Sequence, residues 1–277
     1  MPRRHRFGIP ALLITGLYVG ALAVTAVIAL TTGDLGALWR LTLFTGVAQG
    51  VAVTWPNTLI LVVAGLPCAW ALWQSLRGPL TGPAPELDRD TRRLRMGLYA
   101  AAASWACYAL APTWPWWAVA LDAALMWVVV VLFQPVLGSR LEHADHARAA
   151  GVVAYGGAAA IEVIDVLNWP LPDWLPVICG LAGLIWMVLV LRAQRRSGRW
   201  QQATVRYGVA ALVAPVLLTV VSLPLATDTN VYGDVASAAQ VLMVIWLARS
   251  AHDLADPSAE PVPSASSPVG AEPPPAQ

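Results

Sequence analysis

The stretch that decides the fold runs from Gly151 to Pro170 and reads GVVAYGGAAAIEVIDVLNWP. It is apolar over about 20 residues, the length of helix that crosses a hydrocarbon core of about 30 Å. Two carboxylic acids, Glu162 and Asp165, interrupt it. An ionised acid at the centre of a bilayer costs roughly 2.5 to 3.5 kcal/mol, so such a residue is expected to face the interior of a helix bundle and to serve a function.

The composition of the whole chain is that of a membrane protein. Of its 277 residues, 58% are hydrophobic and 12% charged, with a mean hydropathy of +0.62, whereas a soluble domain carries about 25% charged residues. The first apolar run is too long for a signal peptide and has no clear cleavage site. We therefore predict an all-α polytopic integral membrane protein with about eight transmembrane helices, over residues 9–31, 56–76, 96–113, 116–137, 149–168, 174–194, 205–226 and 235–250.

The basic residues predict the orientation of these helices. All 17 are arginines, and with eight spans every one except Arg40 falls on the side of the N-terminus. Because basic residues concentrate in cytoplasmic loops, both termini are predicted to be cytoplasmic. The expected location is the cell membrane, as a multi-pass protein of the bacterial inner-membrane type.

Three segments outside the spans have distinct predictions. Residues 1–8 form a basic cytoplasmic N-terminus before the bundle of residues 9–250, and residues 251–277 form a disordered cytoplasmic tail rich in Pro, Ser and Ala. Segment 35–55 is apolar but interrupted by Arg40, Gln49 and several glycines. Counting it as a span would place loop 77–95 on the outer side, so we predict an interfacial or re-entrant segment.

Three acids fall at one depth near the outer surface. Counted from the outer helix ends, Asp122, Glu162 and Asp165 lie roughly 6 to 10 Å deep, and low polarity and mutual repulsion favour the protonated form of at least one of them. We predict Glu162 as a general acid, with Asp122 or Asp165 tuning or relaying its proton. Polar and aromatic side chains near this level are predicted to bind the substrate: Asn57, Trp117, Trp127, Asn168, Trp169 and Gln240.

Structural roles are the alternative for the same residues. An aromatic belt explains most of the outer tryptophans. The acids can instead pair with Arg40 or be neutral and hydrogen-bonded between helices. Neither alternative is decided by the sequence.

Cofactor motifs are scarce. The HxxH pair of His143 and His146, flanked by Glu142 and Asp145, resembles a metal site, but a solvated helix extension explains it better because four ligands in one short loop converge poorly. The three cysteines lie in apolar segments without CxxC spacing, which favours small core residues over a disulfide framework. No cofactor, metal or nucleic acid is predicted as a partner, only the lipid bilayer and a hydrophobic small molecule.

In size, in helix number and in its embedded acids without a metal motif, the chain resembles the small membrane-bound terpene cyclases of meroterpenoid and indole-terpenoid pathways. The resemblance implies an isomerase or lyase of terpenoid biosynthesis, within secondary metabolism, that protonates an epoxide or olefin of a prenylated substrate. It carries over no individual residue. Two alternatives stay open: a proton-coupled transporter or export and immunity protein, and an accessory membrane subunit without chemistry.

Overall fold

The structure, a computed structural model, describes residues 5–43, 53–81, 86–110, 115–138, 143–222 and 240–256, without the side chains of residues 108–110, 215, 216, 218–222 and 240. Helices dominate these ranges, and the one β-bridge recorded there joins His5 to Leu80. The elements are α1 (Gly8–Thr32), α2 (Gly36–Leu43), α3 (Trp55–Leu76), α4 (Arg89–Leu110), α5 (Trp116–Leu137), α6 (Ala144–Gly151), the π-helical turn η2 (Val152–Gly156), α7 (Gly157–Val166), α8 (Trp174–Ser197), α9 (Gln202–Ser222) and α11 (Gln240–Asp253).

Within the described residues, helix covers nearly all of each predicted span. Five segments are long and apolar enough to cross a membrane: α1, α3, α5, the continuous segment Ala144–Val166 and α8. The other three predicted spans correspond to α4, α9 and α11. The prediction of an all-helical protein with several apolar helices able to cross a membrane is confirmed for the part of the chain that the structure describes.

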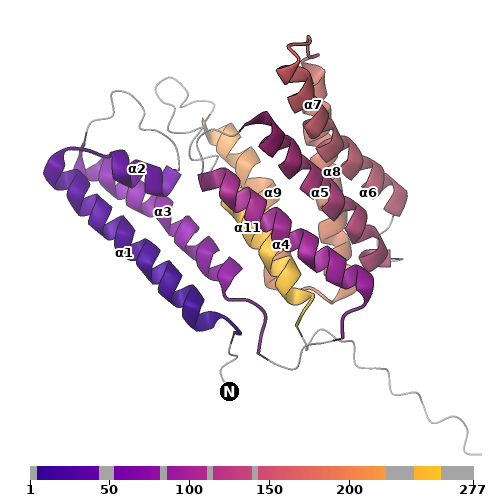
Figure 1. The fold of residues 1–277 in the computed structure, drawn as a ribbon, viewed down its shortest axis with the longest axis horizontal. Helices are drawn as coiled ribbons and strands as arrows, with labels where there is room; N and C mark the ends of the chain where they lie inside the picture. The colour runs from indigo at the N-terminus through magenta and orange to yellow at the C-terminus, as the bar shows by residue number, and fades with distance from the viewer. Residues whose placement is uncertain are drawn as a thin grey trace, which may run out of the picture.

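The helices form two groups (Figure 1). On one flank α1, α2 and α3 lie side by side, and α1 packs chiefly on α3 and α2. The second group contains α4 to α9, and α11 joins the two groups because it contacts α3 as well as α4 and α9. The last helix of the described ranges therefore lies near the middle of the bundle (Figure 1).

Three aromatic rings form the centre of the larger group. Phe133 of α5 stacks on Trp246 of α11, with ring centroids 6.3 Å apart, and Trp186 of α8 meets Trp246 edge-on at 6.3 Å. The Nε1 of Trp246 donates to Oε1 of Gln194 at 3.1 Å. The buried indole therefore has a partner for its only donor, as a buried polar group requires.

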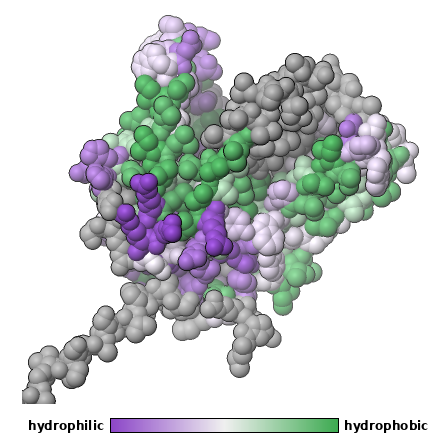
Figure 2. Space-filling model, turned by 180° about the vertical axis from the view of Figure 1, so that it is seen from behind, coloured by the Kyte–Doolittle hydropathy of each residue, from purple (hydrophilic) through white to green (hydrophobic). Residues whose placement is uncertain are grey.

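The surface of the bundle is largely apolar. Figure 2 shows hydrophobic residues across the middle of one face and hydrophilic residues gathered toward its lower edge. Many large apolar side chains are exposed on α1, α3 and α8. A surface of this kind is stable in hydrocarbon, whereas in water so large an apolar patch drives association.

Two boundaries can be compared with the predictions. In segment 35–55 the described part is the short helix α2, which buries Leu38 and Trp39 against α1 and α3; residues 44–52 lie outside the described ranges. At the other end, α11 continues to Asp253 and the chain is buried through Asp256. The packed part of the protein thus extends past residue 250, where the tail was predicted to begin, and residues 257–277 are outside the described part.

Candidate functional site

Asp122 is the acid that the structure places among other helices. It lies on α5 and is partly buried, and its Oδ1 is buried without a hydrogen-bond partner among the described residues. The hydroxyl of Ser104 on α4 is a hydrogen-bond partner of the carboxyl group, and Tyr155 of η2 lies close enough to interact with it electrostatically. A carboxyl group with an unused oxygen inside an apolar bundle is a candidate for chemistry, because buried polar groups are normally satisfied.

The π-helical turn η2 positions Tyr155. It begins directly after Gly151, where an added Cβ would overlap Cγ1 of Val130 and lie 2.8 Å from Cδ1 of Trp186. Only glycine lets the helix approach α5 and α8 this closely. The Tyr155 ring then meets Trp186 edge-on, with centroids 5.5 Å apart. Single π turns inside helices occur frequently at functional sites.

Glu162 and Asp165 lie on α7, which packs on α5 and α8. Glu162 is partly exposed and Asp165 is exposed. Asn168, just past the end of α7, is exposed and has a left-handed backbone with φ of 52°. The structure records no interaction of Asp122 with Glu162 or Asp165 among the described residues, so the three acids share a region but not a contact. Arg40 is exposed on α2 and has no recorded interaction with them either.

The tryptophans predicted to bind substrate face outward. Trp117, Trp127 and Trp169 are 58%, 44% and 63% exposed. For Trp117 and Trp169, near helix ends, this is typical of an aromatic belt, whereas Trp127 lies in the middle of α5. Asn57 is partly buried in the first turn of α3, where its backbone N–H donates to the Thr54 hydroxyl. Gln240 begins α11, but its side chain is outside the described part. The substrate-binding role of all these residues stays a prediction.

The structure also locates the HxxH pair and the cysteines. The rings of His143 and His146 lie 5.6 Å apart at the start of α6, and the described residues contain no group of three side chains able to hold a metal ion; Glu142 lies outside them. All three cysteines are free, with Cys68 and Cys179 buried as expected. Cys107 is exposed, so the prediction of a core position was wrong for that residue.

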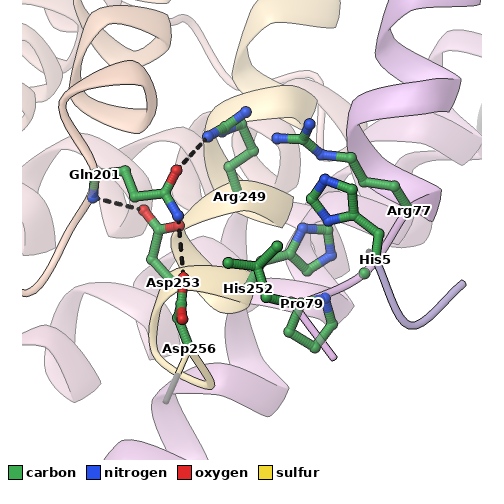
Figure 3. Close-up of a pocket in the computed structure, with 10 residues that line it drawn as sticks. His5, Arg77, Pro79, Gln201, Arg249, His252, Asp253 and Asp256 are labelled. Carbon is green, nitrogen blue, oxygen red and sulfur yellow. Dashed lines mark hydrogen bonds between the residues drawn. The ribbon is translucent and has the colours of Figure 1, made fainter. Parts of the chain in front are cut away.

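A second polar site lies at the opposite end of the bundle (Figure 3). We call it the basic-end pocket, a cavity of about 150 Å³. It lies where the beginning of α1, the end of α3, the beginning of α9 and the end of α11 meet. Its lining residues are His5, Arg77, Gly78, Pro79, Leu80, Gln201, Arg249, His252, Asp253 and Asp256.

Arg249 organises this pocket and is only 5% exposed. Its Nε donates to Thr204 Oγ1 at 3.1 Å, and its two terminal nitrogens donate to Gln74 Oε1 at 2.8 Å and Gln201 Oε1 at 3.1 Å. Gln201 in turn donates from its backbone N–H to Asp253 at 2.9 Å and from its side chain to Asp256 at 3.1 Å. Neutral groups thus connect the buried cation to the buried acids.

Sequence reasoning treated these arginines and histidines only as markers of topology. The local signal was nevertheless present, because Arg249, His252 and Asp253 are three and four residues apart and so share one face of a helix. Ser104 and Tyr155 carried no comparable signal. A serine and a tyrosine within an apolar run are ordinary.

His252 should make the protein sensitive to mild acid. It lies past the end of the predicted span, and burial, followed by the charges of Arg77 and Arg249, lowers its pKa from 6.5 to about 3. As pH falls the unfolded chain is protonated first, so stability is complete above pH 6.5 and is lost progressively between 6.5 and about 3. Acidification from pH 7 to pH 5 should therefore lower the free energy of unfolding by about 2 kcal/mol through this residue.

Other titratable or charged groups face the His252 ring, namely Tyr99 and Arg95 on α4, His5, Arg77, Arg249 and Asp253. Burial raises the pKa of Asp253, which acts in the opposite direction. The measurement is therefore the difference between the wild type and His252→Gln in unfolding free energy at pH 7 and pH 5. The variant should lose the acid-dependent decrease, and the exposed His146→Gln should retain it. Equal pH dependence in all three proteins would contradict the prediction.

The comparisons with known proteins add no relative: no protein-family model matches the chain, and no curated protein or solved structure matches it significantly. The described fold defines its class, that of helical proteins with several apolar helices able to cross a membrane.

Proposed function

We propose that the chain is an eight-span integral membrane protein of the cell membrane, with both termini in the cytoplasm. The basic-end pocket supports this topology, since it joins the beginnings of α1 and α9 to the ends of α3 and α11. Helices that cross the membrane alternately bring these particular ends to one side. The abundance of arginine near them favours the cytoplasmic side.

Within this topology, the proposed function is that of a membrane-embedded acid catalyst that isomerises a hydrophobic, prenylated small molecule. One observation carries the proposal: Asp122 has a buried carboxylate oxygen without a partner among the described residues. A protonated carboxyl group there can donate to a substrate dissolved in the membrane. Asp122 therefore takes the role of general acid that the sequence suggests for Glu162, for which no buried unpartnered oxygen is recorded among the described residues.

The proposed reaction is balanced without any co-reactant. The Asp122 proton adds to an olefin carbon or to an epoxide oxygen, leaving a carbocation and the carboxylate. The cation is attacked by a second double bond, which closes a ring. Loss of a proton from the ring to the Asp122 carboxylate gives an isomer of the substrate and restores the acid. The faces of neighbouring aromatic rings, such as Tyr155, would stabilise the cation.

The same geometry makes proton transport the weaker candidate. Inward from Asp122 on α5, the buried residues are apolar: Met126, Val129, Val130 and Phe133. Phe133 packs against Trp200, next to the basic-end pocket. Packed apolar side chains thus separate the embedded acid from the polar residues at the other end, where a transport path would need water or hydrogen-bonding groups.

The test uses the purified protein in lipid nanodiscs with farnesylated and geranylgeranylated aromatic acceptors and their epoxides. Product formation is followed by chromatography with mass detection, since a cyclised isomer keeps the mass of its substrate. Asp122→Asn should lower turnover by about 100-fold or more, the usual contribution of a general acid. The matched control is Asp173→Asn, because Asp173 is exposed in the outer loop and caps no helix with its side chain.

Turnover that survives in Asp122→Asn would overturn the role of this acid. Turnover lost in Glu162→Gln but not in Asp122→Asn would return the role to Glu162. Absence of turnover with every prenylated substrate would favour the accessory subunit without chemistry.

A further inference from the structure

We propose that the basic-end pocket is a binding site for a phosphate group, separate from the acid site on α5 and independent of the function proposed for it. The pocket is a cavity of about 150 Å³, large enough for a phosphate and several waters at a water's share of about 30 Å³. Two guanidinium groups, those of Arg77 and Arg249, lie next to each other at one side of it (Figure 3).

The two arginines are positioned for an anion. Every nitrogen group of Arg249 is held by a neutral oxygen, so its positive charge is solvated but not neutralised by those partners. The Nε of Arg77 is buried without a hydrogen-bond partner among the described residues. Burial and the charge of Arg249 lower the pKa of Arg77 to about 10, so it stays protonated at neutral pH. The charge of Arg249 thus acts against that of Arg77, and an anion between the two guanidinium groups would attract both.

The acids of the pocket accept hydrogen bonds from Gln201, and Asp253 also attracts Arg77 and Arg249 electrostatically. Asp253 accepts from the backbone of Gln201, and Asp256 accepts from its side chain. Figure 3 shows both carboxylates on the Gln201 side, away from Arg77 and His5. The pocket thus has an acidic side closed by Gln201 and a basic side that includes the unpartnered Nε of Arg77.

Two histidines complete the basic side. Burial lowers the pKa of both His5 and His252, so each imidazole is neutral at pH 7 and has one N–H to donate. The Nδ1 of His5 is buried without a hydrogen-bond partner among the described residues. The N–H of His5 is engaged by the backbone of Gly78, so the contribution of the neutral imidazoles beside the two guanidinium groups is that they add no further repulsion.

The segment before α1 is fixed in place as one wall of the pocket. The backbone N–H of Arg6 donates to Pro79 at 3.0 Å, and that of Phe7 donates to Arg77 at 3.1 Å. Gly78 has a positive φ of 69°, and an added Cβ would lie 2.7 Å from Cδ2 of Phe7. These main-chain contacts therefore hold His5 over the cavity. A binding site needs side chains that are fixed in position in this way.

The phosphate can belong to a lipid or be free in solution. An apolar groove between α1 and α3, which includes Leu12, Val19 and Trp70, lies on the same half of these helices. Trp70 Nε1 donates to the Tyr207 hydroxyl at 2.7 Å, and the Arg249 guanidinium lies 5.5 Å from the centre of the Tyr207 ring. The groove wall is thus connected to the pocket, which gives the chain of a phosphate-headed lipid a place to lie.

The test measures thermal unfolding of the full chain in detergent, by tryptophan fluorescence, at fixed ionic strength. Inorganic phosphate and dodecyl phosphate are titrated separately, with chloride and uncharged dodecyl maltoside as their controls. We expect a saturable rise in unfolding temperature with at least one phosphate. Arg77→Gln should weaken the binding on the order of tenfold, as for one lost charge-assisted hydrogen bond, whereas the exposed Arg93→Gln should not.

The two titrations distinguish the sources. A response to dodecyl phosphate alone identifies a lipid ligand, and a response to both identifies the phosphate group itself. If Arg77→Gln fails to fold, His5→Ala serves in its place, since His5 precedes the first helix. No saturable response to either phosphate, or equal responses in Arg77→Gln and Arg93→Gln, would overturn the proposal.

Discussion

Replacement of Arg249 by leucine is expected to lower the free energy of unfolding by about 3 kcal/mol. The guanidinium donates to Gln74, Thr204 and Gln201, and all three acceptors lose a charged donor at once. Removal of a buried charge recovers part of its desolvation cost, which keeps the expected loss below the sum of three hydrogen bonds. The measurement is equilibrium unfolding in mixed micelles.

Lysine should not restore the stability lost at position 249. The three acceptors lie on α3, at the beginning of α9 and just before α9. The fork of a guanidinium can reach all of them, whereas the single ammonium of lysine cannot. Arg206→Leu is the control, because Arg206 is exposed on α9. If Arg249→Leu unfolded with the same free energy as Arg206→Leu, the hydrogen bonds recorded around Arg249 would not contribute to stability.

A valine at Gly208 should cost about 3 kcal/mol through overpacking. An added Cβ there would overlap Cδ2 of Leu191 and lie 2.7 Å from Cδ1 of Trp246. Leu191 and Trp246 are both buried, and Trp246 is part of the central aromatic stack. The neighbours therefore cannot move aside without disturbing α8 and α11.

Gly180→Val is the matched control for this substitution. Gly180 also lies within a helix, but nothing lies within 4 Å of the position that its Cβ would take. Valine is a better helix former than glycine, so the control should be as stable as the wild type or more so. Equal losses at the two positions would show that the cost comes from the helix backbone and not from packing between helices.

The helices could be predicted from sequence because span length is a local property. Each run of about 20 apolar residues fits one crossing, and each coincides with helix in the described ranges. Segment 35–55 is predicted as interfacial or re-entrant from the side on which loop 77–95 must lie, and this stays a prediction because only residues 35–43, which include the helix α2, and residues 53–55 of the segment are described. The end of α11 was placed too early, because residues 251–256 look like the start of a polar tail, yet pack against the rest of the bundle.

The relation between Glu162 and Asp122 could not be predicted in the same way. Counting residues gives depth along a helix but not rotation about its axis. The π turn η2 adds a residue to one turn of the segment, which changes the direction of later side chains by about 100° relative to a regular helix. Residue counting therefore describes the position of Asp122, on the regular helix α5, more directly than the direction of the side chains on α7.

The basic-end pocket was hidden for a different reason. Its residues come from four chain segments, around positions 5, 77, 201 and 249, and none of these segments contains a recognisable motif. Only the spacing of Arg249, His252 and Asp253 was visible locally. Convergence of helix ends depends on how the bundle packs, which no single stretch of sequence contains.

Arg249 forms hydrogen bonds with segments of the chain that are synthesised much earlier. Arg249 is 175 positions from Gln74, one of its acceptors, so α3 is synthesised long before its partner has left the ribosome. The segment just before α1, which forms one wall of the pocket, is also synthesised long before α11. During translation the ends of α1, α3 and α9 that line the pocket therefore lack these partners until α11 has been made. A nascent chain that stops before α11 would have neither the pocket nor the centre of the bundle.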